Sequence, residues 1–276
     1  MWPEEMIDRG IYTDMVACCP ETNIVLGTEY LHHDTPARPD FWFGSYLVSR
    51  CPVDEGYLNQ VRAEWQQRFS HRTGLVKQIV QWEESVEGDY QCLEPRKIGK
   101  MAADPDLVLV FNKESQSIGA PNLSNHSLAQ RAVLEFARNN SDFEEVFGLA
   151  LNHVRSTPDS PATEEFLRWR YVQHQARMCQ GQGFWGMMKV DGKLLATCGI
   201  VISGSTARFR DVTTHPEWRG RGLGREMCRR VVDHVFALPQ IKQVVIVATP
   251  NSQAERIYRY LGFRPASIQY SLVWDY

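Results

Sequence analysis

One short segment of the chain has the residue types of a phosphate-binding loop. Glycines stand at positions 220, 222 and 224, with arginines between and around them. We expect a strand before this segment and an amphipathic helix after it, so backbone N–H groups would lie at the positive end of a helix dipole. Glycine leaves those N–H groups unobstructed by side chains. The segment therefore predicts a site for a diphosphate.

The local charge supports this interpretation. Residues 215–230 contain five arginines and two glutamates, a net charge of +3 in a chain whose total is −3. The simpler alternative is a glycine-rich turn followed by a solvated, charged helix. A dinucleotide site matches less well, because its G-x-G-x-x-G spacing requires glycine at position 225, which is Arg225. The Lys-Ser/Thr pair of a nucleoside-triphosphate loop is also absent.

A second motif occupies residues 251–263 and reads N-x-x-A-x-x-I-Y-x-x-x-G-F. Asn251 or Ser252 can cap a helix here, and Gly262 can end that helix in a left-handed conformation. One helix face would carry Ala254, Ile257, Tyr258 and Leu261. The motif thus places Tyr258 on a largely apolar face, where a core aromatic is the simplest interpretation.

The two motifs together resemble those of the GNAT superfamily, the N-acetyltransferases that use acyl-coenzyme A. The first is R-x-x-G-x-G on Arg219, Gly222 and Gly224, and the second begins at Asn251. The similarity is strong over residues 207–263 and looser from residue 143 onward. It implies an α/β (α+β) GNAT fold, with a mixed central sheet flanked by helices. It also implies an acyltransferase of class EC 2.3.1 that takes acetyl-CoA as its co-substrate.

The same resemblance implies roles for individual residues. Backbone groups of the strand before the loop would hold the acetyl and pantetheine arm, the loop amides would hold the diphosphate, and Tyr258 would be the general acid. The residues expected to contact coenzyme A are Val212, Thr213, Thr214, Arg219, Gly220, Arg221, Gly222, Leu223, Gly224, Arg225 and Asn251.

The implied reaction is direct attack of an amine on the thioester, and it needs a proton acceptor. A lysine-like amine has a pKa of about 10.4, so only about one molecule in a few thousand is unprotonated at pH 7. Some family members carry a glutamate on the strand before Asn251, but residues 243–247 contain no carboxylate. We expect Asp211 to be the general base, because it lies on the strand that lines the acceptor side. His215, Glu217 and a chain of water molecules are alternatives.

The first half of the chain predicts a separate domain. Residues 115–127 read SQSIGAPNLSNHS, a run of turn-forming residues that indicates a linker. We therefore expect an N-terminal domain over residues 1–122 and a catalytic domain over residues 123–276. The first has strands and a core pattern but no glycine-rich loop, and it resembles the degenerate GNAT-like half of a bacterial subgroup.

Hydrophobic periodicity predicts the elements that position these residues. In the first half, we expect strands at residues 24–29, 41–48, 75–82 and 107–111 and a helix at 54–69. In the second half, we expect helices at 143–154, 163–179, 223–236 and 252–261, and strands at 184–190, 194–203, 207–214, 243–249 and within 267–274. The Asp191-Gly192 pair predicts the positive-φ turn of a hairpin.

Composition narrows the class of protein. The net charge of −3 argues against a nucleic-acid binder, and the absence of a signal peptide or long apolar run predicts a cytoplasmic protein that does not span a membrane. Seven cysteines without a C-x-x-C pair indicate free thiols in a reducing compartment. The run His32-His33-Asp34 lacks a second cluster of ligands, so we expect no metal.

The acceptor amine is not specified by these motifs. It would be a small molecule or a peptide. The alternative function is a non-catalytic module that holds acyl-CoA as a sensor or scaffold, and turnover of acetyl-CoA with a panel of amines would separate the two.

Overall fold

Two units, each with its own strands and helices, make up the computed structural model. It describes residues 10–18, 21–75, 77–86, 93–117, 127–157 and 163–275. Among these, the first unit takes in the residues up to Leu109, Val247–Glu255 and those from Pro265 onward, and the second takes in Val110–Ile246 and Arg256–Arg264. The predicted boundary between residues 122 and 123 lies outside the described residues and stays a prediction.

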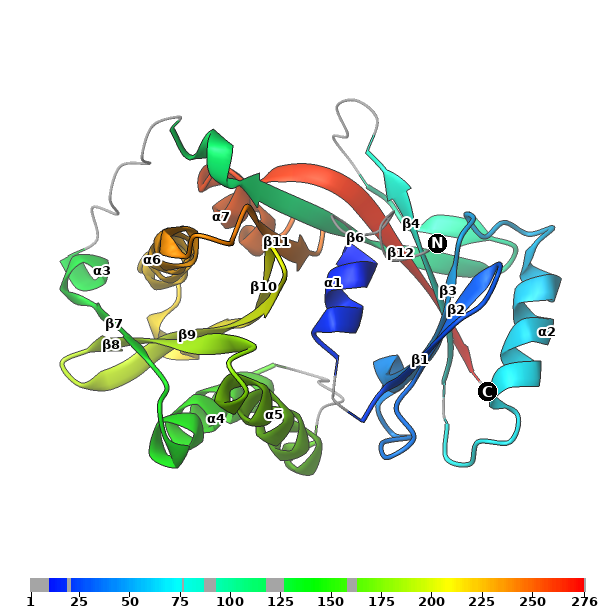
Figure 1. Ribbon diagram of the computed structural model, residues 1–276, viewed down its shortest axis with the longest axis horizontal. Helices are drawn as coiled ribbons and strands as arrows, with labels where there is room; N and C mark the ends of the chain where they lie inside the picture. The colour runs from blue at the N-terminus through cyan, green and yellow to red at the C-terminus, as the bar shows by residue number, and fades with distance from the viewer. Residues whose placement is uncertain are drawn as a thin grey trace. The chain divides into compact units, whose positions relative to one another are not determined.

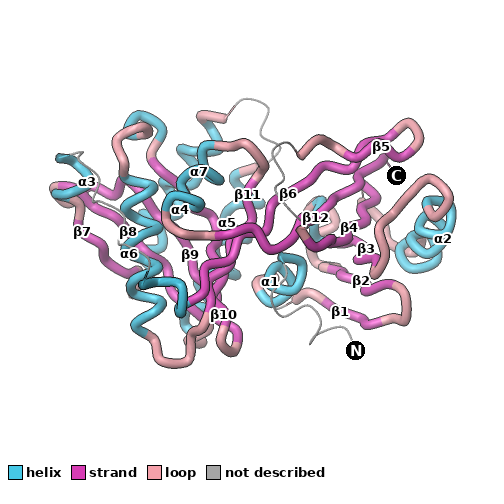
Figure 2. Tube along the Cα trace, turned by 90° about the horizontal axis from the view of Figure 1, so that it is seen from above, coloured by secondary structure: helices cyan, strands magenta, loops and turns pink. Residues whose placement is uncertain are grey.

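The first unit is a mixed sheet with helices. Its strand order is β1-β2-β3-β4-β12-β6, and β5 pairs with β6. β3 and β4 are parallel, whereas β4 and β12 pair antiparallel from Lys77 opposite Asp275 to Ser85 opposite Ser267. α1 and α2 lie on opposite faces of this sheet (Figures 1 and 2). The elements are α1 Gly10–Val16, β1 Asn23–Leu26, β2 Tyr30–Asp34, β3 Ser45–Ser49, α2 Leu58–Phe69, β4 Lys77–Ser85, β5 Arg96–Ile98, β6 Met101–Asn112 and β12 Arg264–Asp275.

The five elements predicted for the first half all form, with different bounds: β4 and β6 cover Lys77–Ser85 and Met101–Asn112 instead of 75–82 and 107–111. The other three are shortened at one end, where backbone turns replace regular structure. The expected helix start at residue 54 is a turn, in which the Asp54 carboxylate accepts a hydrogen bond from the backbone N–H of Tyr57 at 2.8 Å. The expected strand at 41–48 starts at Ser45, after a 3₁₀ turn over Trp42–Gly44. The first strand ends at Leu26, because Gly27 closes a turn onto the carbonyl of Tyr30.

The second unit has the strand order β11-β10-β9-β8-β7, in which only the β10–β11 pair is parallel. α4 and α5 cover one face of this sheet, and α6 covers the other (Figure 1). The elements are α3 Ser127–Arg131, β7 Val133–Phe136, α4 Asn140–Arg155, α5 Glu164–Cys179, β8 Gly183–Val190, β9 Lys193–Ser203, β10 Thr206–Thr214, α6 Leu223–Ala237, β11 Gln243–Ala248 and α7 Gln253–Tyr260.

Local sequence signals explain much of this unit. Asn139 and Thr163 cap α4 and α5, each accepting a hydrogen bond from a backbone N–H three residues further on. Asp191 and Gly192 both have positive φ, +50° and +78°, and turn β8 into β9. This hairpin is confirmed, as is the mixed α/β class.

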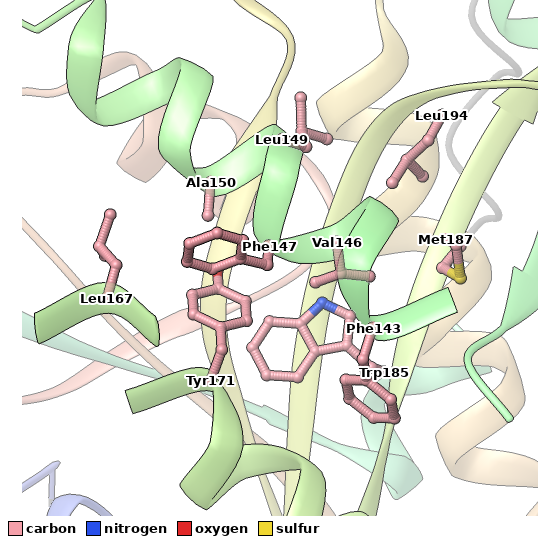
Figure 3. Packing of buried hydrophobic residues seen from close by; sticks show 10 residues of the cluster. All are labelled: Phe143, Val146, Phe147, Leu149, Ala150, Leu167, Tyr171, Trp185, Met187 and Leu194. Atoms are coloured by element: carbon pink, nitrogen blue, oxygen red, sulfur yellow. The ribbon is translucent and has the colours of Figure 1, made fainter. Parts of the chain in front are cut away.

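The core under α4 and α5 is built around Trp185. Its indole Nε1 donates a hydrogen bond to Thr197 Oγ1 at 2.7 Å, and that hydroxyl donates to the carbonyl of Gly186 at 2.7 Å. Aromatic and aliphatic side chains from both helices pack around the indole (Figure 3). The cluster contains Phe143, Val146, Phe147, Leu149, Ala150, Leu167, Tyr171, Trp185, Met187 and Leu194.

Candidate functional site

The glycine-rich segment forms the turn between β10 and α6. Gly220 and Gly222 have φ of +73° and +78°, left-handed values that glycine adopts at little cost. Gly222 is the N-cap of α6 and supplies no side chain to its first turn. The first backbone N–H groups of a 15-residue helix are therefore open to an anion at the positive end of the helix dipole.

The third glycine lets the start of α6 approach the end of β10 closely. A Cβ built on Gly224 would lie 3.1 Å from Thr214 Oγ1, and apart from its chain neighbours and the backbone of α6 itself no other described atom would lie within 4 Å. This spacing is tighter than an ordinary van der Waals contact. Alanine at position 224 would therefore require the Thr214 side chain or the first turn of α6 to shift by a few tenths of an ångström.

α6 buries an apolar stripe, as predicted, but one of its charged residues also turns inward. Leu223, Met227 and Val231 are buried. Glu226 is only 3% exposed and forms ion pairs with Arg229 and Arg230. Burial raises the pKa of Glu226, but the two arginines outweigh it and hold that pKa below its ordinary value.

Because Arg229 and Arg230 pair with Glu226, the arginines left for the loop are Arg219, Arg221 and Arg225. Arg221 lies over the Trp218 ring, with its guanidinium carbon 4.7 Å from the ring centroid, and Arg225 lies over Tyr260 at 4.8 Å. Arg219 instead donates to His153 Nδ1 at 2.6 Å and to the carbonyl of Thr214 at 3.4 Å. The aromatic rings hold two of the three cations near the predicted diphosphate site.

β10 separates from its parallel neighbour before it reaches the loop. Its register with β11 joins Thr206–Arg208 to Gln243–Val245, whereas β10 itself continues to Thr214. Beyond Arg208 the backbone edge of β10 is thus not paired with β11. This edge holds Val212, Thr213 and Thr214, the residues expected to bind the acetyl and pantetheine arm.

A β-bulge interrupts the same stretch of β10. Arg210 pairs with Gly199 and Thr213 pairs with Thr197, so two residues of β10, Asp211 and Val212, stand opposite the single residue between those partners. Asp211 has a left-handed φ of +48°. No sequence signal predicts this bulge, although aspartate is one of the few non-glycine residues that tolerate the left-handed region.

Asp211 is engaged by two side chains of α5 that the sequence analysis did not single out. Its carboxylate forms an ion pair with Arg170, and its Oδ2 lies 3.3 Å from His174 Nε2. Burial raises the pKa of Asp211, but Arg170 and His174 outweigh it and hold that pKa far below its ordinary range. A carboxylate so stabilised in its charged form is a weak base. The general-base role of Asp211 stays a prediction.

The other base candidates differ in their surroundings. His215 Nδ1 is buried and has no hydrogen-bond partner among the described residues, and the His215 backbone N–H donates to the Leu195 carbonyl at 2.8 Å. Glu217 is exposed. His153, in the last turn of α4, was not predicted; burial and then the Arg219 cation lower its pKa.

Tyr258 lies on α7 with only 6% of its surface exposed. Burial, and then the Cys228 and Cys198 thiols, raise its pKa well above the ordinary value of 10. The phenol is therefore protonated at neutral pH and can donate a proton, but its acidity is low. Its role as general acid stays a prediction.

Asn251 stands before α7 with a φ of +61°. Its backbone N–H donates to Glu255 Oε2 at 2.5 Å, and Ser252 Oγ accepts from the Glu255 backbone N–H at 3.1 Å. Of the two cap residues left open by the sequence, Ser252 supplies the side-chain cap. The Asn251 side chain is exposed, and its predicted contact with pantetheine stays a prediction.

In the part of the chain that the structure describes, no group of three or more His, Cys, Asp or Glu side chains could hold a metal ion. Among the described helices, none is both long and apolar enough to cross a membrane.

Comparison with known proteins identifies the second unit. Residues 132–263 match the model of the Acetyltransferase (GNAT) family. A candidate [ribosomal protein bS18]-alanine N-acetyltransferase of Bacillus subtilis (strain 168) is 27% identical over 89 residues, which are 32% of this chain and 59% of that relative. The chain thus spans about three fifths of the length of this curated relative.

Two solved structures are similar to almost the whole chain. A conserved protein of unknown function from Staphylococcus epidermidis ATCC 12228 has a TM-score of 0.67 at 10% identity, covering 97% of this chain and 98% of that one. A tandem GNAT protein from the clavulanic acid biosynthesis pathway has a TM-score of 0.55 at 13% identity, covering 94% and 84%. At such identities the likeness concerns the fold alone, and it confirms the predicted GNAT fold. The interpretation of the N-terminal residues as a degenerate GNAT-like domain of their own stays a prediction.

Proposed function

We propose that this chain, whose residues 132–263 belong to the GNAT acetyltransferase family, transfers an acetyl group from acetyl-CoA to an amine. The observation that carries the proposal is the turn from β10 to α6. Two left-handed glycines there open the N-terminus of a 15-residue helix to an anion, beside Arg221 and Arg225. A diphosphate fits this combination of backbone N–H groups and cations.

In the proposed complex, the diphosphate binds at residues 219–225, and the pantetheine arm runs along the edge of β10 that is not paired with β11. A ligand there can complete the hydrogen bonds that β11 no longer makes past Arg208. Backbone N–H groups at Val212 to Thr214 are then available to the thioester carbonyl, whose oxygen gains negative charge as the amine attacks. Holding amine and thioester side by side lowers the barrier further.

The two proton transfers fall to different groups. The amine must lose a proton, and the contacts of Asp211 with Arg170 and His174 make that carboxylate a poor acceptor. We assign this transfer to His215, whose Nδ1 is unengaged among the described residues, or to water. Tyr258 donates to the leaving thiolate. Because burial raises the pKa of Tyr258, we expect this donation to contribute about 10- to 1,000-fold to the rate, less than the largest effects of general acid catalysis.

The acceptor is a primary amine, and a protein N-terminus is one candidate. The curated relative is named for acetylation of an alanine of a ribosomal protein, which supports testing a peptide of that kind here. The non-catalytic alternative has no support from the family, whose matched model is that of an acetyltransferase.

The test is release of coenzyme A from acetyl-CoA, followed with a thiol reagent. The acceptors are a panel of small amines, free amino acids and peptides with alanine at the N-terminus. Acceptor-dependent release supports the proposal, and mass spectrometry of the acceptor identifies the acetylated nitrogen. Tight binding of acetyl-CoA by calorimetry with no turnover on any acceptor would favour the sensor alternative instead.

A further inference from the structure

We propose that Asp211, Arg170 and His174 form a lock that holds the bulge of β10 in the shape that binds acetyl-CoA. Asp211 is then a positioning residue rather than the general base. The expected effect on acetyl-CoA binding rests on the proposed function. The contacts that form the lock are present in the cofactor-free chain, so they can be tested without acetyl-CoA.

The bulge decides which way the end of β10 faces. Arg210 stands opposite Gly199, where an added Cβ would lie 2.7 Å from the Trp185 ring, so this position faces α4 and α5. Thr213 stands opposite Thr197, whose hydroxyl bonds to Trp185, so it faces the same side. Three residues apart on a regular strand, Arg210 and Thr213 would face opposite sides.

One inserted residue therefore turns Thr214 toward α6. The 3.1 Å approach between Thr214 Oγ1 and a Cβ on Gly224 places Thr214 directly beneath the first turn of that helix. The Thr214 carbonyl also accepts a hydrogen bond from Arg219 at 3.4 Å. Removing the bulge would turn Thr214 to the other face and withdraw the strand from the phosphate loop.

The bulge needs support, because it interrupts the β9–β10 ladder and holds Asp211 at a left-handed φ of +48°, which aspartate tolerates better than most residues but less well than glycine. The support comes from one helix. Arg170 and His174 are four residues apart on α5, so both reach the same carboxylate. His174 is itself held in place, 4% exposed, with its ring centroid 5.2 Å from that of Trp185 and 5.9 Å from that of Tyr171.

The lock and the cofactor site lie on opposite faces of the sheet, and the bulge connects them. The carboxylate of Asp211 points to α5, whereas Thr214, three residues later, meets α6. Loss of the carboxylate on one face should therefore disturb cofactor binding on the other face. A general base would have no such effect on binding.

The experiment compares Asp211→Asn, Arg170→Gln and the double variant. Asparagine nearly matches the shape of aspartate and tolerates a left-handed φ, so Asp211→Asn removes mainly the charge. Each single variant is expected to raise the Kd for acetyl-CoA at least about fivefold. Each should also lower kcat/KM about 10- to 100-fold, the range for a displacement of about 1 Å. The double variant should be little worse than either single one, because both break one unit.

Matched controls come from an exposed ion pair between the same two helices that cover this face. Arg168 on α5 donates to Glu144 on α4 at 3.0 Å. Arg168→Gln and Glu144→Gln make the same chemical changes and should leave the Kd and kcat/KM unchanged. Arg170→Lys keeps the positive charge and is a milder change, so it tests the lock if a neutral variant fails to fold. Its Kd for acetyl-CoA and its kcat/KM should lie between those of wild type and Arg170→Gln.

Hydrogen exchange of the backbone amides at residues 211–214, without cofactor, tests the lock independently of the reaction. Faster exchange in Asp211→Asn and Arg170→Gln, but not in the controls, supports the lock. If the wild-type protein binds no acetyl-CoA, the proposed function fails, but this exchange result still supports the lock. Unchanged exchange overturns the lock. A loss of kcat in Asp211→Asn with unchanged Kd, and no effect of Arg170→Gln, overturns it in favour of a general base.

Discussion

Gly222→Ala offers a quantitative test of the phosphate loop. Gly222 has a φ of +78° at the N-cap of α6, and an alanine held there is strained by about 1–2 kcal/mol. If the loop keeps its shape, this strain appears as lost stability. If the free loop relaxes into an ordinary conformation, the strain appears when the cofactor restores the left-handed turn, and the affinity falls about 5- to 30-fold.

Gly192→Ala is the matched control. Gly192 also has a φ of +78°, it lies in the β8–β9 hairpin, and an added Cβ there would have nothing within 4 Å. It should lose stability alone, about 2–4 °C in Tm for each kcal/mol in a protein of this size. Gly222→Val, which adds a branched side chain, should abolish acetyl-CoA binding.

The measurements are calorimetric titration with acetyl-CoA and thermal unfolding without it. For Gly222→Ala, the losses of binding and folding free energy should together come to about 1–2 kcal/mol, whereas for Gly192→Ala the binding part should be zero. A folded Gly222→Val that binds acetyl-CoA as tightly as wild type would refute the assignment of the loop, and with it the acetyltransferase proposal.

Three further predictions concern separate groups. Tyr258→Phe should lower kcat about 10- to 1,000-fold with the Kd for acetyl-CoA unchanged, and an unchanged kcat in steady-state assays would remove the phenol from the mechanism. Arg221→Ala should weaken acetyl-CoA binding about 10- to 100-fold at low salt and less at high salt, since a charge-assisted contact is screened; a salt-independent defect would contradict this. Burial lowers the pKa of His33 to about 4, so the unfolded chain binds the extra proton and stability should fall by about 3 kcal/mol as the pH drops from 6.5 to about 4. Urea unfolding across that range should show a shallower fall for His33→Gln, and an identical pH dependence would argue against a buried neutral imidazole.

Features that depend on neighbouring residues could be predicted from the sequence alone. The glycine run, the basic amphipathic helix after it and the Asp191-Gly192 hairpin all follow from conformational preferences within a few residues. The same holds for the caps of α4 and α5. Together with the motif at residues 251–263, these local signals were enough to indicate the GNAT fold.

Features that depend on residues far apart in the chain could not be predicted from the sequence alone. The sheet of the first unit takes its strand β12 from the end of the chain, pairing Ser267 with Ser85. Glu226 reads as a surface residue of an amphipathic helix, and its burial depends on Arg230, which also donates to the Ala132 carbonyl at 2.6 Å. Such pairings leave no periodic trace in the sequence.

The carboxylate of Asp211 is the clearest case. In the sequence it is an acidic residue on a strand beside a phosphate loop, which fits a general base. The tertiary structure surrounds it with Arg170 and His174, 41 and 37 residues earlier in the chain, and places it at a left-handed bulge. Type and position along the chain suggested the chemistry, but basicity depends on the charges that folding brings within a few ångströms, and only the folded chain determines those.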